Sequence, residues 1–108
     1  MSESTELTNQ IIDYIYRSGG YAWRAESSGV FDKNIGGYRT SPKKGVADVL
    51  GIYKGRLIAI EVKIGKDHLS PEQEGFLKNI EYYGGLIFVA KDIDSFKKWF
   101  DEKLCTCA

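Results

Sequence analysis

The sequence predicts one α/β domain, in which a mixed central sheet is flanked by helices and the elements follow the order αβββαβα. Apolar and polar residues alternate in two stretches near the middle of the chain, which is typical of strands. Near both ends apolar residues recur every three or four positions, which is typical of helices. A chain of 108 residues is long enough for one hydrophobic core and too short for two. We assign the domain to residues 1–104 and expect residues 105–108 to form a frayed C-terminal tail.

The first helix is expected over residues 4–18. Its apolar positions are spaced to share one face: Leu7, Ile11, Ile12, Ile15 and Tyr16. Ser4 or Thr5 can cap its start, and the glycines at 19–20 end it.

A strand is expected over residues 21–27, where large apolar and polar residues alternate. Residues 28–45, "SGVFDKNIGGYRTSPKKG", are rich in glycine, serine and lysine and have no sustained periodicity. They predict a strand fragment and a long mobile loop, and a loop of this length in a small domain is often functional.

Residues 46–64 predict a β-hairpin with strands over 46–53 and 57–64 and a tight turn between them. In the second strand, period-2 alternation places two kinds of side chain on opposite faces. The apolar face carries Ile58, Ile60, Val62 and Ile64, and the other face carries Glu61 and Lys63.

The rest of the chain predicts a helix, a strand and a helix. Ser70 caps the first of these helices, Pro71 lies in its first turn, and the glycines at 84–85 end it. Residues 86–90 form an unbroken apolar run of the kind found in strands that are covered on both faces. A last helix is expected over residues 92–103, with an inner stripe of Ile93, Phe96, Trp99, Phe100 and Leu104.

Composition favours a globular domain of the cytoplasm. Hydrophobic residues make up 43% and charged residues 28% of the chain, and no apolar run approaches the roughly 20 residues that a bilayer requires. The first ten residues are polar and acidic, unlike a signal peptide. Cys105 and Cys107 are too close together for a disulfide to constrain the fold, so we expect a reducing compartment, the cytosol of a bacterium or of a viral host, and no membrane.

Charge is unevenly distributed although the formal net charge is zero. Residues 43–66 hold six basic and two acidic side chains, a net charge of +4. The preceding residues, 1–42, carry −1, and residues 67–108 carry −3. A local positive potential of this kind can attract a phosphate backbone even when the whole molecule is neutral.

Asp48 is unusual because it lies within an apolar strand sequence, where an unpaired carboxylate is costly to bury. It can be a satisfied structural acid, a salt-bridge partner or a metal ligand. Asp48 and Glu61 lie seven residues before and six residues after Gly55, so the hairpin places them at the same height on neighbouring strands. Two such carboxylates repel each other unless a cation lies between them, and Mg²⁺ or Mn²⁺ prefers oxygen ligands.

A cation at this position would polarise a phosphodiester and activate a water molecule. Lys63, farther along the same face, could orient that water or stabilise charge on the phosphate. The alternative is a surface cluster of ion pairs on a hairpin, in which Lys63 alone neutralises the acids.

Asp48, the Glu61-Val62-Lys63 triplet and Gln73 occur in the order of the PD-(D/E)XK nuclease pattern, which this chain resembles. More narrowly, residues 43–90 resemble the VRR-NUC family in carrying G-x-x-D, E-x-K, a short glycine-containing loop, L-S-x-x-Q, and a G-G pair before a strand. The sequence departs from the pattern at Ala47, where the motif has proline. The resemblance implies a restriction-endonuclease-like fold.

The resemblance also implies an activity, a divalent-metal-dependent DNA endonuclease. In it Asp48, Glu61 and the backbone carbonyl of Val62 would hold Mg²⁺ or Mn²⁺, Lys63 would be the catalytic lysine, and Gln73 would help orient the site.

Family members also carry a glutamate on the first helix that approaches the metal, often through water, and Glu6 is the candidate here. Glu6 could instead serve only the helix dipole, as first-turn glutamates commonly do, and Gln73 could be structural.

Small stand-alone members resemble Holliday-junction resolvases, which act as dimers on branched DNA. A homodimer is also expected because one subunit of this size offers little surface to a branched DNA. Candidate contacts to the DNA backbone are Lys43, Lys44, Arg24 and Lys66, although the two adjacent lysines could equally be solvated loop residues.

Two rival functions remain open. One is a nuclease for flaps, nicks or plain duplex DNA, and the other is a DNA-binding module without catalysis.

Overall fold

A computed structural model describes residues 2–25, 30–32, 37–39 and 45–105, with side chains given for 2–25 and 45–104. Its elements are α1 (Glu3–Arg17), β1 (Tyr21–Arg24), β2 (Val30–Asp32), β3 (Gly37–Arg39), β4 (Val49–Tyr53), β5 (Arg56–Val62), α2 (Pro71–Tyr82), β6 (Leu86–Ala90), α3 (Ile93–Phe100) and a closing π-helical turn, η1 (Asp101–Cys105).

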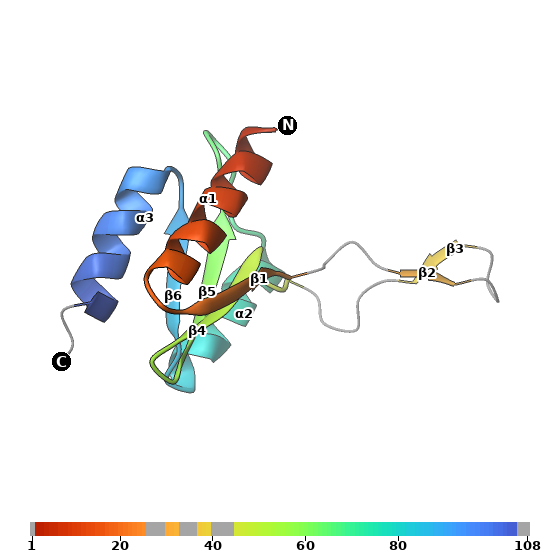
Figure 1. Ribbon diagram of the computed structural model, residues 1–108. Helices are drawn as coiled ribbons and strands as arrows, with labels where there is room; N and C mark the ends of the chain where they lie inside the picture. The colour runs from red at the N-terminus through yellow and green to blue at the C-terminus, as the bar shows by residue number, and fades with distance from the viewer. Residues whose placement is uncertain (1, 26–29, 33–36, 40–44, 106–108) are drawn as a thin grey trace.

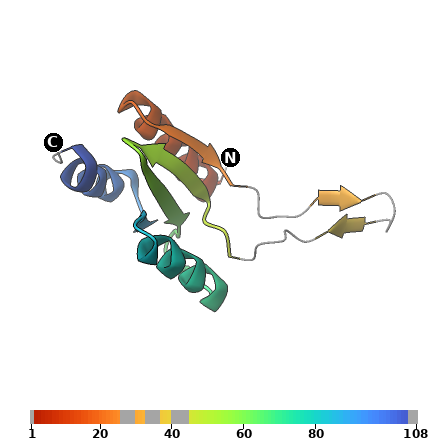
Figure 2. The same ribbon diagram turned by 90° about the horizontal axis from the view of Figure 1, so that it is seen from below.

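Four strands form the main sheet in the order β1-β4-β5-β6. β4 is antiparallel to both β1 and β5, whereas β6 is parallel to β5, so the sheet is mixed. Figure 1 and Figure 2 show α1 and α3 on one side of this sheet and α2 on the other. The main sheet and its helices confirm the predicted order αβββαβα, to which β2 and β3 add a separate two-stranded sheet.

The β4–β5 turn sets the register that positions the acidic residues. Lys54 and Gly55 both have positive φ, at 49° and 80°, as the two central residues of a type I′ hairpin turn do. Because Val49 pairs with Ile60, the preceding and following residues, Asp48 and Glu61, are brought opposite each other.

The core has two layers, one on each side of the sheet. On the α1 and α3 side, residues from both helices bury the apolar face of β5: Leu7, Ile11, Ile15, Ile58, Ile60, Phe96 and Phe100. On the α2 side a smaller cluster is built around Ala47, Ala59 and Leu77. Successive residues of β6 pack alternately against the two layers, which confirms the prediction of a strand covered on both faces.

Several element boundaries differ from the prediction. Ser2 caps α1, because its side chain accepts the N–H of Thr5 at 3.2 Å, so the predicted caps already lie within the first turn. Tyr16 is 48% exposed instead of buried, and Thr8 takes a place in the interior. The predicted strand over 21–27 is observed as β1 up to Arg24, and its residues 26–27 lie outside the described residues. The predicted strands over 46–53 and 57–64 are shorter than expected, and η1 extends the last helix to Cys105.

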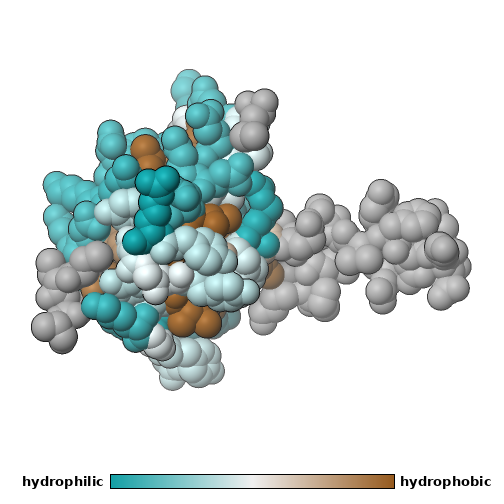
Figure 3. Space-filling view, in the orientation of Figure 1, coloured by the Kyte–Doolittle hydropathy of each residue, from teal (hydrophilic) through white to brown (hydrophobic). Residues whose placement is uncertain are grey.

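The face that α1 crosses is mostly hydrophilic, with apolar residues visible only as small separate patches (Figure 3). Among the helices in the described part of the chain, none has both the length and the apolar character that a bilayer crossing needs.

Candidate active site

Asp48 lies in a bend immediately before β4, and the predicted strand over 46–53 is therefore wrong at its start. The physical reason is a side-chain hydrogen bond. One carboxylate oxygen of Asp48, Oδ2, accepts the backbone N–H of Val62 at 2.8 Å. The backbone carbonyl of Asp48 accepts the N–H of Ala25 at 3.0 Å. Asp48 thus joins β4 to β5 through its side chain, and its carboxylate is fixed at the end of β5.

Glu61 points from β5 towards α2 and is 1% exposed. Its Oε1 accepts a hydrogen bond from the Gln73 side-chain amide at 3.3 Å. Its other oxygen, Oε2, is buried and has no hydrogen-bond partner in the described part of the chain. The carboxyl of Asp48 lies within hydrogen-bonding reach, so the two acids face the same side of the sheet and can share a proton or a cation.

The pKa of Glu61 is raised from an ordinary 4.5 to about 8. Burial contributes most, followed by the hydrogen-bonding contact with Asp48 and the negative charge of that residue. Lys63 acts in the opposite direction, since its positive charge favours the ionised carboxylate. A buried acid that holds its proton near neutral pH, beside a second acid, is typical of a site arranged for a positive ligand.

Gln73 connects this pair of acids to the start of α2. Ser70 and Gln73 form a capping box, in which the serine hydroxyl accepts the N–H of Gln73 at 3.1 Å and the glutamine Oε1 accepts the N–H of Ser70 at 2.8 Å. The glutamine Nε2 remains to donate to Glu61. The Gln73 side chain therefore both caps the start of α2 and holds the Glu61 carboxylate, so that the positive end of the helix points at the site.

Separate substitutions of the two capping-box residues distinguish the effect of helix capping from the effect of site geometry. In Gln73→Glu, the new carboxylate can still accept the backbone N–H of Ser70, but it places another acid beside Glu61. The cleavage rate should therefore fall about 10- to 100-fold, as it does when other residues that orient metal ligands are replaced. Ser70→Ala should cost about 1 kcal/mol of folding stability and leave the rate unchanged at low temperature. Denaturation curves and cleavage rates of both variants check this, and equal losses of rate would contradict it.

The contacts of Gly45 explain why the G-x-x-D motif has glycine at this position. Its φ is +77°, and a Cβ at this position would overlap the main-chain carbonyl group of Glu72 and lie 2.8 Å from the backbone nitrogen of Gln73. The segment before Asp48 therefore passes directly against the first turn of α2. Ala47 follows, fully buried in the cluster beneath that helix, so alanine fits where the motif has proline.

Gly45→Ala should destabilise the fold by several kcal/mol, because the residue has both a left-handed backbone and no room for a methyl group. Gly55→Ala is the matched control: its φ is +80°, but nothing lies within 4 Å of the added Cβ. That variant should lose only about 1 kcal/mol. Urea denaturation of the two proteins measures the difference, and equal stability would show that contact with α2 is unimportant.

The other candidate residues lie on several different segments. Lys63 is half-buried just after β5, and its backbone N–H bonds to Ala90 at 3.0 Å. Arg24 is exposed and donates to Asn9 at 3.3 Å, and Lys66 is exposed in the turn after β5. Lys43 and Lys44 lie outside the described residues.

Glu6 is exposed at the start of α1 and lines a shallow pocket with Ile64 and Lys91. Within residues 2–25 and 45–104, no three acidic, histidine or cysteine side chains lie close enough together to hold one metal ion. Glu6 is therefore not joined directly to Asp48 and Glu61, and its approach through water stays a prediction.

The residues present nevertheless fit a hard divalent cation. Mg²⁺ is commonly held by one or two carboxylates and completes its coordination with waters and substrate oxygens. Asp48 and Glu61 supply the two carboxylates, and the orphaned Oε2 of Glu61 supplies an acceptor that needs a positive partner.

The hydrogen bond from the backbone N–H of Val62 to the Asp48 carboxylate could not be predicted from the sequence, because residue spacing gives the height of a side chain but not its hydrogen-bond partner.

Comparisons with known proteins support the fold. No family model and no curated protein matches the chain. A solved structure of Hjc, a Holliday junction resolvase from the archaeal hyperthermophile Archaeoglobus fulgidus, matches with a TM-score of 0.57 and 23% identity, over 82% of this chain and 67% of that one. The chain therefore has a mixed α/β fold like that of a nuclease of the resolvase type.

Proposed function

We propose that this protein is a divalent-metal-dependent DNA endonuclease that acts on branched DNA, in the manner of a Holliday-junction resolvase. The observation that carries the proposal is the buried Glu61 Oε2, which has no hydrogen-bond partner among the described residues and belongs to a carboxyl group that lies beside that of Asp48. The archaeal resolvase of like fold supports the reaction class, and the E-x-K sequence at the end of β5 supplies the side chains that the reaction needs.

Each residue has a defined task in this proposal. Asp48 and Glu61, with the backbone carbonyl of Val62, would hold Mg²⁺ or Mn²⁺. When bound, such a cation lowers the pKa of a coordinated water and offsets charge on the scissile phosphate. Lys63 directs its ammonium group at the attacking water or at the phosphate oxygens. Gln73 holds the Glu61 carboxylate in place, and the N-terminus of α2 adds a favourable field for an anion.

The substrate is inferred from charge and from the resolvase neighbour. The segment that contains the site, residues 43–66, carries a net charge of +4 on a chain whose total is zero, which favours contact with DNA through this segment. Resolution of a four-way junction requires cuts in two opposing strands, which a homodimer with two such sites provides.

A digestion panel tests the proposal. The protein is incubated with labelled four-way junctions, flaps, nicked duplex and linear duplex, each with Mg²⁺, Mn²⁺ or a chelator. We expect paired cuts in the junction that depend on the cation, with slower cleavage of linear duplex. Preferred cleavage of flaps would support the nuclease activity but show that the proposed substrate is wrong. An absence of metal-dependent cleavage on every DNA would overturn the proposal.

A further inference from the structure

The α2 side of the sheet is only half covered by that helix. α2 packs on β5 and β6, and the buried cluster beneath it includes Ala59 and Leu77. On the uncovered half, Tyr21, Ile52 and Leu57 lie opposite one another across β1, β4 and β5. These side chains are 59%, 44% and 37% exposed. They form a continuous apolar row on the surface of three neighbouring strands.

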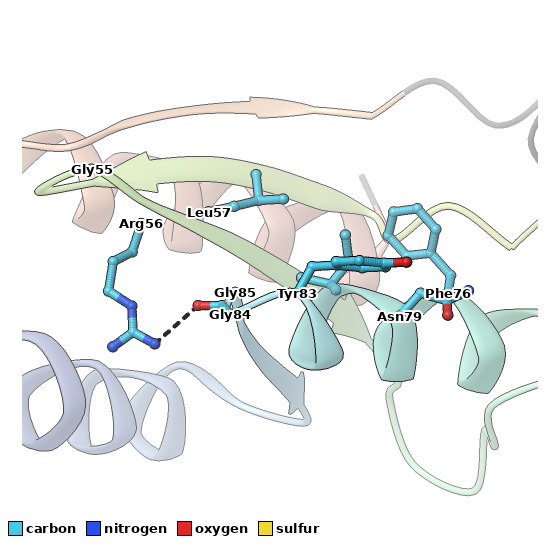
Figure 4. Close-up of a pocket in the computed structure, with 9 residues that line it drawn as sticks. Gly55, Arg56, Leu57, Phe76, Asn79, Tyr83, Gly84 and Gly85 are labelled. Atoms are coloured by element: carbon cyan, nitrogen blue, oxygen red, sulfur yellow. Dashed lines mark hydrogen bonds between the residues drawn. The ribbon is translucent and has the colours of Figure 1, made fainter.

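The row continues into a pocket at the far end of β5 from the acids. The pocket has a volume of about 580 Å³ and lies between the β4–β5 turn and the last turn of α2. Leu57, Phe76 and Tyr83 surround it, and Tyr83 is 83% exposed (Figure 4). At the other end of the row, the rings of Tyr21 and Trp23 lie 5.5 Å apart. We call the surface formed by these residues the apolar trough: Tyr21, Trp23, Ile52, Leu57, Phe76 and Tyr83.

The chemistry of the trough favours a protein partner over nucleic acid. None of its six side chains is charged, whereas contact with DNA requires Lys or Arg beside the phosphates. Arg56, the one cation among the described residues that line the pocket, donates to the backbone carbonyl of Gly84 at 3.0 Å (Figure 4). From their exposed fractions, the trough side chains present on the order of 500 Å² of mostly apolar surface, the size of the largest patch on a typical monomer, and such patches are often functional.

A second copy of this chain is the partner that fits best. A stable interface needs roughly 800 Å² from each partner, and the trough supplies more than half of that from one patch. It borders β1, an edge strand with no strand paired to its outer side among the described residues. Such an edge offers backbone hydrogen bonds to another strand, and two identical apolar surfaces complement each other about a twofold axis.

We propose that two copies of the protein associate through the apolar trough. This proposal deepens the proposed function, because it names the surface that pairs the two nuclease subunits. Leu57 and Glu61 point to the same face of β5, four residues or about 13 Å apart. An interface centred on Ile52 and Leu57 would therefore lie towards the end of β5 away from the acid pair, which leaves a site in each subunit for a strand of DNA.

The test compares oligomeric state with metal binding in the same variants. Ile52→Lys places a charge in the centre of the trough, and Leu57→Lys does so at its junction with the pocket. Gln10→Lys is the matched control, since it adds the same charge at an exposed position of α1, on the other side of the sheet. Mass is measured by light scattering and sedimentation, and the thermal shift caused by Mn²⁺ reports separately on the acid pair.

We expect the wild type and Gln10→Lys to have twice the mass of the 12.2 kDa chain, and both trough variants to dissociate about 100-fold more readily because an ammonium group would be buried unpaired. All four proteins should keep the Mn²⁺ shift. A monomeric wild type, or trough variants that stay dimeric, would overturn this surface while leaving the nuclease proposal intact. If Mn²⁺ caused no thermal shift in the wild type, that result would count against the proposed nuclease centre and not against the dimer surface.

Hydrogen exchange of the wild type gives a readout that does not depend on folding of a variant. Dilution should raise exchange in β1 and β4 selectively, and unchanged protection there on dilution would also overturn the proposal.

Discussion

Asp48→Asn is expected to reduce metal-dependent cleavage about 10³-fold or more while leaving the fold intact. The asparagine oxygen can still accept the N–H of Val62, so the bend before β4 is preserved. What is lost is one of two negative charges that would hold the cation, and the cation is worth several kcal/mol of transition-state stabilisation. The measurement is a single-turnover rate on a four-way junction in Mg²⁺ or Mn²⁺, together with a circular dichroism spectrum.

Asp67→Asn is the matched control for this substitution. Asp67 is an exposed residue of the loop after β5, and it belongs neither to the acid pair nor to α2. It removes the same charge from the same region of sequence, so its rate should stay within about twofold of the wild type. A cleavage rate for Asp48→Asn within tenfold of the wild type would show that Asp48 is only a structural acid.

Glu61→Gln is expected to abolish cleavage and also to stabilise the metal-free protein at alkaline pH. The pKa of Glu61 is raised in the folded state to about 8 from an unfolded value of 4.5, so the folded state holds a proton that the unfolded state has released between these values. The contribution of Glu61 to the free energy of unfolding is therefore fully present below about pH 4.5 and is lost as the pH rises towards 8. Glutamine does not titrate, so Glu61→Gln does not lose folding stability in this way.

Thermal denaturation of metal-free protein between pH 5 and pH 9 measures the effect. The wild type should lose at least about 5 °C more than Glu61→Gln across this range, because about 1 kcal/mol shifts the melting temperature of a domain of this size by several degrees. Mn²⁺ should restore the wild type most strongly at the alkaline end and leave Glu61→Gln unchanged. Parallel pH profiles for the two proteins would contradict a buried, protonated Glu61.

The convergence of the two acids could be predicted because it depends on local rules. A two-residue turn at Lys54 and Gly55 fixes the hairpin register, and the register places Asp48 opposite Glu61. Gln73 could be placed for a similar reason. Ser70 and Pro71 mark the start of α2, so a residue three positions after the cap lies in the first turn, next to the site.

Other features depended on three-dimensional packing. Residue patterns show which face of a strand a side chain occupies, but not whether a helix covers it. The exposure of Ile52 and Leu57 follows from the position of α2 over β5 and β6, which no local pattern specifies. The departure of Asp48 from the strand likewise depends on a partner 14 residues away, Val62. The catalytic and metal-binding roles of these residues stay predictions until the variants are measured.

The acids are anchored to the most interior strand of the molecule. β5 is bonded on both sides, to β4 and β6, and buried on both faces by the two core layers. Amides in such a segment open only when the whole domain does, so those of Ile60 to Val62 should exchange most slowly with deuterated solvent. The proposed nuclease centre, held on this strand, would already be ordered before a cation binds. Cofactor capture would then cost little conformational entropy, and chelation would empty the centre without unravelling its scaffold.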